Sequence, residues 1–200
     1  MTRFKYKNAV LWLLLILPYV ALIPAYIWYS HVLHDVKDST FIIISKQDMM
    51  LYHYNYRGEL LQKSPVATGK NLGNKAAIGD RKTPEGVFSI GDVRDASTWG
   101  HDFADDTLGE IKGAYGPYFI SLNVPGQKGI GIHGTHDPHS IGTRASEGCI
   151  RMPNKELIQL VDHIKSAAVV IITPSQSDVD STVAAIKKQE FKVTPKPKKK

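Results

Sequence analysis

Cysteine is nearly absent from this 200-residue chain, which contains a single one, Cys149. A single cysteine excludes an internal disulfide, and it also excludes the paired-cysteine sites of structural zinc. His133, His136 and His139 follow one another at three-residue spacing, but on a loop broken by Pro138. This spacing is typical of neither the helical HExxH motif nor a zinc finger. We therefore predict no metal site and no cofactor.

The middle of the chain lacks a basic stripe interleaved with aromatic residues, although the net charge is +6. The positive charges are concentrated at the two ends, in RFKYK and KPKKK. None of the common nucleic-acid-binding motifs is present, so we predict no nucleic-acid partner. The stretch ATGKNLGNK lacks the spacing GxxxxGK[ST], which excludes a phosphate-binding loop of that type.

Charge is also absent from residues 9–29, AVLWLLLILPYVALIPAYIWY. This length is about what a helix needs to cross a bilayer, and aromatic residues lie towards the ends of the run. Basic residues in 1–8 predict a cytoplasmic N-terminal end, with everything after residue 29 on the outer, periplasmic or extracytoplasmic side. A cleaved signal peptide is the alternative, but no small-x-small cleavage site follows the run. We expect an uncleaved single-pass anchor in the cytoplasmic membrane.

Short β-branched or alternating segments dominate the exported part, which predicts a mainly β fold with one or two helices. A hairpin is expected over residues 49–68, with its turn near Asn55 to Gly58. A helix is expected over residues 154–167, with Asn154 as its N-cap and one apolar face. The other expected strands are residues 41–45, 87–93, 117–123, 128–134 and 168–173, the last of them central in the sheet.

Two segments lack a clear pattern. Residues 95–115 have no hydrophobic period but contain Trp99 and His101, which is typical of either a functional lid or a disordered insert. Residues 175–200 form a polar, lysine-rich tail that begins with a possibly helical stretch and ends in a segment unable to bury a core. The predicted domain between the anchor and this tail covers residues 40–174.

Three residues that suit nucleophilic catalysis occur close together in the sequence: His133, Ser146 and Cys149. A thiol has an ordinary pKa near 8.5, so a neighbouring imidazole that accepts its proton makes it a better nucleophile. Gly148 allows a sharp turn before the cysteine and lets backbone N–H groups converge as an oxyanion hole requires. A lone cysteine is more often a small buried hydrophobic residue. Arg151 is either a solvated surface charge or a clamp for a carboxylate.

The stretch IGIHGTHDPHSIGTRASEGCIRM resembles the signature of the L,D-transpeptidase catalytic domain, the YkuD-like family of bacterial cell-wall enzymes. GDRKTPEGVFSI and YGPYFISL also resemble stretches of that domain, and the resemblance spans roughly residues 40 to 173. It implies a β-sandwich or barrel of that family, with a helix packed after the cysteine. It also implies peptidoglycan stem peptides as substrates and carbapenem-type β-lactams as inhibitors.

The resemblance assigns a role to each residue of the signature. Cys149 would attack a tetrapeptide stem, release D-alanine and form a thioester, which an amine then resolves. His133 would be the general base, the carbonyl of Gly134 would orient its ring, and backbone N–H groups around Gly148 would form the oxyanion hole. The positions implied for substrate binding are Ser146, Arg151, Glu147, Tyr118 and Thr135.

Glu147 departs from the pattern, because many members have a histidine between the serine and the glycine. A carboxylate at this position raises the thiol pKa if it points towards the sulfur. We therefore expect Glu147 either to point away from the sulfur or to pair with Arg144 or Arg151.

Three functions remain open from the sequence. The first is a transpeptidase whose acceptor is a neighbouring stem, giving a 3→3 cross-link, or a lysine of a lipoprotein. The second is a hydrolase on the same scaffold, an L,D-carboxypeptidase or amidase, with water as the acceptor. The third is a membrane-tethered wall-binding module that Glu147 has inactivated.

Overall fold

The computed structural model describes residues 17, 18, 20, 22–32, 39–103, 109–164 and 168–193, with side chains up to residue 188. It divides into two compact units, Met1–Ser39 and Thr40–Lys200. In the first unit, residues 22–32 are helical. Much of the predicted anchor, and all of the basic end at 1–8, lie outside the described residues. Among the residues that are described, no helix has both the length and the apolar character needed to cross a membrane.

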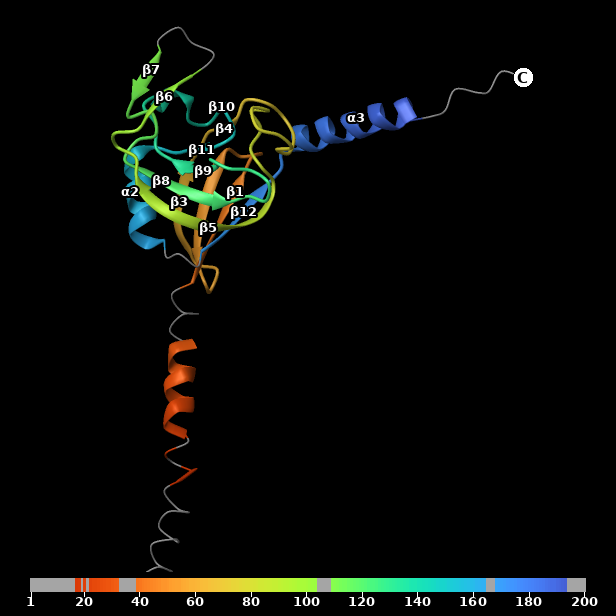
Figure 1. Ribbon diagram of the computed structural model, residues 1–200. Coiled ribbons are helices and arrows are strands. Elements are labelled where there is room, and N and C mark those ends of the chain that lie inside the picture. The colour runs from red at the N-terminus through yellow and green to blue at the C-terminus, as the bar shows by residue number, and fades with distance from the viewer. Residues whose placement is uncertain are drawn as a thin grey trace, which may run out of the picture. The chain divides into compact units, whose positions relative to one another are not determined.

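The second unit is built on an eight-stranded sheet, with the strand order β11-β9-β8-β5-β12-β1-β2-β3 (Figure 1). The predicted hairpin is confirmed, because β2 and β3 pair antiparallel on either side of a turn at residues 56–59. The strands of this sheet are β1 (Thr40–Ser45), β2 (Met50–Asn55), β3 (Leu60–Pro65), β5 (Gly86–Asp95), β8 (Tyr118–Asn123), β9 (Gly131–His133), β11 (Ile150–Arg151) and β12 (Val169–Thr173). The fold is therefore mainly β, as the short β-branched segments predict.

The strand β12 occupies the central place expected for it. It runs parallel to β1 and antiparallel to β5, and its apolar residues alternate into the core on one face. Two residues beyond β3, Ala67 forms an antiparallel bridge with Arg151 of β11, with N···O distances of 2.8 and 3.0 Å. This bridge joins the two ends of the strand order. The sheet consequently curls almost into a barrel around a core of isoleucine, leucine and valine.

The helix α2 (Asn154–His163) packs Leu157 and Leu160 into that core, as the spacing of its apolar residues predicts. The expected N-cap is wrong. Pro153 occupies the cap position and makes no side-chain cap hydrogen bond. The Asn154 amide instead accepts a hydrogen bond from the backbone N–H of Thr135 at 2.8 Å and donates one to its carbonyl at 3.1 Å. The polar side chain thus ties the helix to the loop that follows β9.

Residues 95–115 are ordered in part as a hairpin. The strands β6 (Gly100–Asp102) and β7 (Glu110–Lys112) pair antiparallel in a separate two-stranded sheet. The connection at 104–108 lies outside the described residues. We call residues 100–103 and 109–115 the flap. The paired strands show that these residues are not a disordered insert, which was one of the two alternatives for this segment.

Two features lie outside the eight-stranded sheet: a pair of short strands and the helix α3. The short strands β4 (Thr68–Gly69) and β10 (Arg144–Ser146) pair in parallel. After β12 comes the helix α3 (Gln176–Val193). Asp178, in its first turn, has a fully buried carboxylate that accepts hydrogen bonds from the Ser175 hydroxyl at 2.6 Å and the Gly73 N–H at 2.7 Å. The possibly helical stretch after Pro174 is therefore a helix through residue 193. The remainder of the tail lies outside the described part of the chain.

Candidate active site

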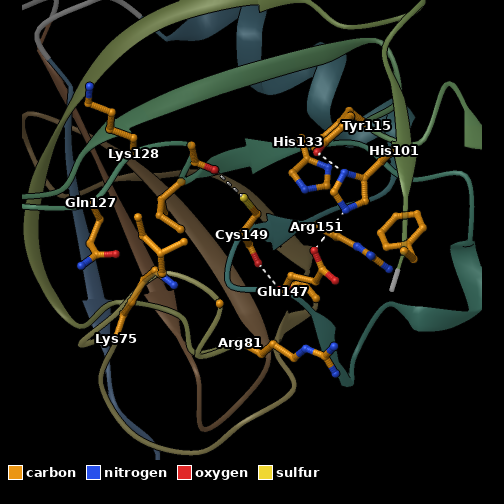
Figure 2. A pocket seen from close by; sticks show the side chains of 16 residues that line it. Lys75, Arg81, His101, Tyr115, Gln127, Lys128, His133, Glu147, Cys149 and Arg151 are labelled. Carbon is orange, nitrogen blue, oxygen red and sulfur yellow. Dashed lines mark hydrogen bonds and ion pairs between the residues drawn. The ribbon is translucent and has the colours of Figure 1, made fainter. Parts of the chain in front are cut away.

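A pocket of about 410 Å³ opens beside β9, β10 and β11 (Figure 2). The expected nucleophile and base, Cys149 and His133, both line it. The other lining residues come from the loop 70–85, the flap, the turn before β9 and the segment 146–151: Lys75, Ile78, Gly79, Arg81, His101, Phe103, Tyr115, Gln127, Lys128, Gly129, Ile130, Ser146, Glu147 and Arg151. Folding thus brings four separate segments around one sulfur atom.

His133 ends β9 and is held by its own neighbour. Its Nδ1 donates a hydrogen bond to the Gly134 carbonyl at 2.7 Å, the contact that the resemblance implies. A carbonyl only accepts, so Nδ1 carries the proton and Nε2 is left with a lone pair. The ring lies between Tyr115, at 4.8 Å with an interplanar angle of 63°, and Phe119, stacked at 5.8 Å. This tautomer is the one that a general base needs.

Cys149 is partly exposed, and its Sγ–H donates to the Gly129 carbonyl at 3.2 Å. The pKa of this thiol is raised to about 11. Burial is the main cause; a backbone hydrogen bond from Gly131 and the positive charges of Arg151 and Lys75 oppose it, while Glu147 reinforces it. At neutral pH the sulfur is therefore a protonated thiol.

The pKa of His133 is lowered to about 3, chiefly because burial disfavours the imidazolium. The hydrogen bond to Gly134 opposes this shift, while the charge of Arg151 adds to it. His133 and Cys149 are both neutral in this state, so the pair is not a preformed thiolate and imidazolium. Neutral forms of both side chains suit His133 to the role of a general base rather than to that of one half of an ion pair.

Ser146 shapes the turn that presents the sulfur. Its hydroxyl donates to the Cys149 carbonyl at 2.5 Å and accepts from the Gly148 N–H at 3.1 Å. Gly148 has φ of +134°, and a Cβ there would lie 2.9 Å from the carbonyl oxygen of Lys82, so only glycine fits without strain. One expected oxyanion donor, the Gly148 N–H, is thus engaged by Ser146. It serves an oxyanion only if Ser146 releases it.

Glu147 is paired, but with neither predicted arginine. Its Oε2 lies 3.1 Å from Nε2 of His101 on the flap. Arg144 instead binds Asp178 at 2.7 Å. His101 also meets the Tyr115 hydroxyl, with Nδ1 to Oη at 3.0 Å. Figure 2 shows the three side chains joined in a row beside His133.

Arg151 lies in the pocket, 6% exposed, with its guanidinium 5.0 Å above the ring of Phe103. Its Nε has no hydrogen-bond partner among the described residues. A buried guanidinium with an unmet donor suits a carboxylate ligand.

The two other residues implied for substrate binding lie elsewhere. Tyr118 packs against the core cluster, and Thr135 is buried in the loop tied to Asn154. Neither lines the pocket, whereas Tyr115 does. Their assigned roles stay predictions.

The loop 70–85 contributes residues that the sequence did not single out. Thr83 is fully buried, and its hydroxyl donates to the Gly148 carbonyl at 3.0 Å while accepting from the Gly69 N–H at 2.8 Å. Lys75 is held by Asp80 at 2.8 Å. The Thr83–Gly148 contact joins positions 65 residues apart, whereas the Lys75–Asp80 pair lies within the loop. The only local signal for Thr83 was the polar stretch GDRKTPEG.

Comparison with known proteins agrees with this geometry. The model of the L,D-transpeptidase catalytic domain family, YkuD, matches residues 39–172. The Bacillus licheniformis protein YkuD, assigned as an L,D-transpeptidase, is 34% identical over 118 residues, which cover 59% of this chain and 56% of that protein. The chain thus spans about half the length of this relative.

Two solved structures share the fold. The catalytic domain of the Enterococcus faecium L,D-transpeptidase is 21% identical, with a TM-score of 0.50, and the match covers 67% of this chain and 96% of that one. The L,D-transpeptidase LdtMt1 in complex with imipenem is 17% identical, with a TM-score of 0.51, and the match covers 67% of this chain and 58% of that one. With the family match extending over more than half of the sequence, this chain belongs to the L,D-transpeptidase catalytic domain family.

Proposed function

We propose that this protein is a peptidoglycan L,D-transpeptidase that uses Cys149 as its nucleophile. The observation that carries the proposal is one pocket that holds both Cys149 and a His133 whose Nδ1 is fixed by the Gly134 carbonyl. Membership in the family supports the same reaction.

In the first half-reaction, the thiol leaves the Gly129 carbonyl and attacks the carbonyl that precedes the terminal D-alanine of a tetrapeptide stem. His133 Nε2 accepts the thiol proton as the S–C bond forms, since neither group is ionised beforehand. Collapse of the tetrahedral intermediate breaks the C–N bond, and the leaving amine takes the proton from His133. The product is a thioester on Cys149 and free D-alanine.

In the second half-reaction, an acceptor amine attacks the thioester carbonyl and loses its proton to His133. Cys149 leaves as the thiolate and takes that proton back, so the enzyme is regenerated. The acceptor is a side-chain amine of a neighbouring stem, which gives a 3→3 cross-link. Attachment of a lipoprotein through its lysine would use the same step, and water would make the protein an L,D-carboxypeptidase.

The charges of the pocket support an acidic peptide as the donor. Among the described residues, Lys75, Arg81, Lys128 and Arg151 line it, and Glu147 is the one lining carboxylate. Lys75 is paired with Asp80 and Glu147 with His101. Stem peptides carry free carboxylates at diaminopimelate and at the terminal D-alanine, and arginine binds carboxylates well.

The proposed location is the outer face of the cytoplasmic membrane. The uncharged run over residues 9–29 and the basic residues before it support an uncleaved anchor with the catalytic unit outside. Peptidoglycan lies on that side.

The test mixes the full chain, purified in a mild detergent, with tetrapeptide muropeptides, and reads the products by mass spectrometry. We expect D-alanine release and cross-linked dimers with the parent protein and neither product with Cys149→Ala. His139→Ala is the matched control, because His139 is exposed and does not line the pocket.

Other outcomes select the other functions. Tripeptide monomers without dimers would identify a hydrolase. If the parent protein and Cys149→Ala both bind muropeptides and neither forms an acyl-enzyme, the protein is a wall-binding module. Imipenem gives an independent check: we expect a mass increase on the parent protein and none on Cys149→Ala.

A further inference from the structure

His101 of the flap contacts Glu147, which lies in the segment 146–149 that contains Cys149. Its Nε2 lies 3.1 Å from Glu147, and its Nδ1 lies 3.0 Å from the Tyr115 hydroxyl. A carboxylate needs a donor, so Nε2 carries a proton. The neutral ring then accepts from Tyr115 at Nδ1, and the charged ring donates to it. In both states His101 satisfies two polar partners at once.

Each partner adjoins one member of the reacting pair. Glu147 lies two residues before Cys149, and Tyr115 packs edge-on against the ring of His133 at 4.8 Å. A displacement of His101 would therefore release Glu147 on the sulfur side and Tyr115 on the base side. Phe103 of the flap, 4.5 Å from His101, also covers the guanidinium of Arg151.

An unpaired carboxylate at this place would oppose the chemistry. Attack produces negative charge first on sulfur and then on the oxyanion, and a nearby carboxylate repels both. Glu147 raises the pKa of Cys149 even in the paired state. A hydrogen bond from an imidazole disperses the carboxylate charge and fixes its direction.

We propose that His101 is a positioning residue that holds the Glu147 carboxylate away from Cys149, so that the thiol reacts faster while His101 of the flap contacts Glu147. His101 does not contact the sulfur and is not assigned a proton in the reaction. Among the described residues, the charged and titratable groups around this contact include Glu147, Tyr115, His133, Cys149, Arg151, His136 and Asp137, together with Asp102 and Glu110 on the same hairpin.

The test measures how fast iodoacetamide alkylates Cys149 in the full chain from pH 6 to pH 10. The meaning of this inference for catalysis rests on the proposed function. Alkylation needs no turnover, so the inference and the proposed function can fail separately. We expect His101→Ala to slow alkylation by about three- to tenfold at each pH, which corresponds to a thiol pKa higher by about half to one unit.

The decisive variant is the double substitution His101→Ala with Glu147→Gln. If the carboxylate causes the loss, removing its charge restores the alkylation rate to within about twofold of the parent protein. Lys112→Ala is the matched control, because Lys112 is exposed on β7 of the same hairpin and does not line the pocket. It should alkylate at the parent rate.

Two results would overturn the inference. An unchanged rate in His101→Ala would show that Glu147 needs no partner. Equal slowing in the single and double variants would show that His101 only supports the shape of the flap. Thermal unfolding of every variant checks folding, and His101→Gln, whose amide can still donate to Glu147, repeats the test if alanine unfolds the protein. Its alkylation should then be slower than that of the parent protein, but by less than the three- to tenfold expected of alanine.

Discussion

The two walls of the pocket are held by opposite means. In the loop 70–85, the Gly73 carbonyl accepts a hydrogen bond from Lys46 at 3.1 Å and the Gly73 N–H donates one to Asp178 at 2.7 Å. The side chains of Lys46 and Asp178 are 0% exposed and lie 3.2 Å apart. The flap is held at His101 and Glu147, whose side chains are 29% and 34% exposed. A buried pair resists separation because each charge left alone in the interior is costly, whereas water screens an exposed pair. One wall is therefore a fixed support for Gly148, and the other separates from the nucleophile segment at little cost.

Asp178→Ala should produce the largest change, on the side of the fixed wall. It removes the carboxylate that pairs with Arg144 and one of the two that pair with the buried Lys46, which keeps Glu85 at 2.6 Å, so we expect a loss of about 3–5 kcal/mol in the free energy of unfolding. Thermal or urea unfolding measures it. Asp180→Ala on the same helix is exposed and should cost less than about 0.5 kcal/mol. Equal costs at the two positions would remove the distinction between the walls.

Acid should have the next largest effect on stability, through the buried histidines. The pKa of His133 is lowered to about 3 by burial, so between about pH 6.5 and pH 3 the unfolded chain binds a proton that the folded chain does not. Stability therefore falls as the pH falls through this window, by at most about 1.4 kcal/mol per pH unit from this residue. His53, also buried with a lowered pKa, adds in the same direction. Between pH 7 and pH 4, the free energy of unfolding should depend less on pH for His133→Asn than for the parent protein.

Thr83→Val should have an intermediate effect. It removes the hydroxyl that joins the carbonyl of Gly148 to the N–H of Gly69, and both groups are left unmet in the interior. We expect a loss of about 1–3 kcal/mol and slower transpeptidation. Thr83→Ser, which keeps the hydroxyl, is the control. A valine variant as active and stable as the serine variant would show that the wall does not support the turn.

His101→Ala should have the smallest effect on stability, below about 1 kcal/mol, because its pair with Glu147 is partly exposed. Urea unfolding beside Asp178→Ala makes the comparison direct. A loss as large as that of Asp178→Ala would mean that the flap is an integral part of the fold rather than a separable cover.

Local patterns were sufficient for most of the fold. The turn of the β2–β3 hairpin, the apolar face of α2 and the central place of β12 follow from residue type and spacing over a few neighbouring positions. The contact of His133 with the Gly134 carbonyl was expected from the family resemblance, and the structure contains it. Asn154 shows where such reasoning fails, because a good N-cap residue was given a different partner, Thr135, by the tertiary structure.

Contacts between residues far apart in the sequence could not be predicted from local patterns. Glu147 and His101 are 46 residues apart, and Thr83 and Gly148 are 65 apart. The charge of Glu147 required a partner, but sequence proximity favoured the wrong ones, Arg144 and Arg151. Nothing in the composition of residues 95–115 shows that His101 meets the nucleophile segment, because that depends on how the sheet curls.

The place of β12 also affects how the chain folds. In the eight-strand order, β12 joins the pairs formed by β1, β2 and β3 to those formed by β5, β8, β9 and β11. Until residues 169–173 have emerged, these two half-sheets have no strand between them, and the edges of β1 and β5 are unpaired. Completion of the sheet is therefore a late step of high contact order. Chains that end before Val169 would expose two unpaired strand edges, those of β1 and β5, so truncation should yield aggregates rather than a smaller folded protein.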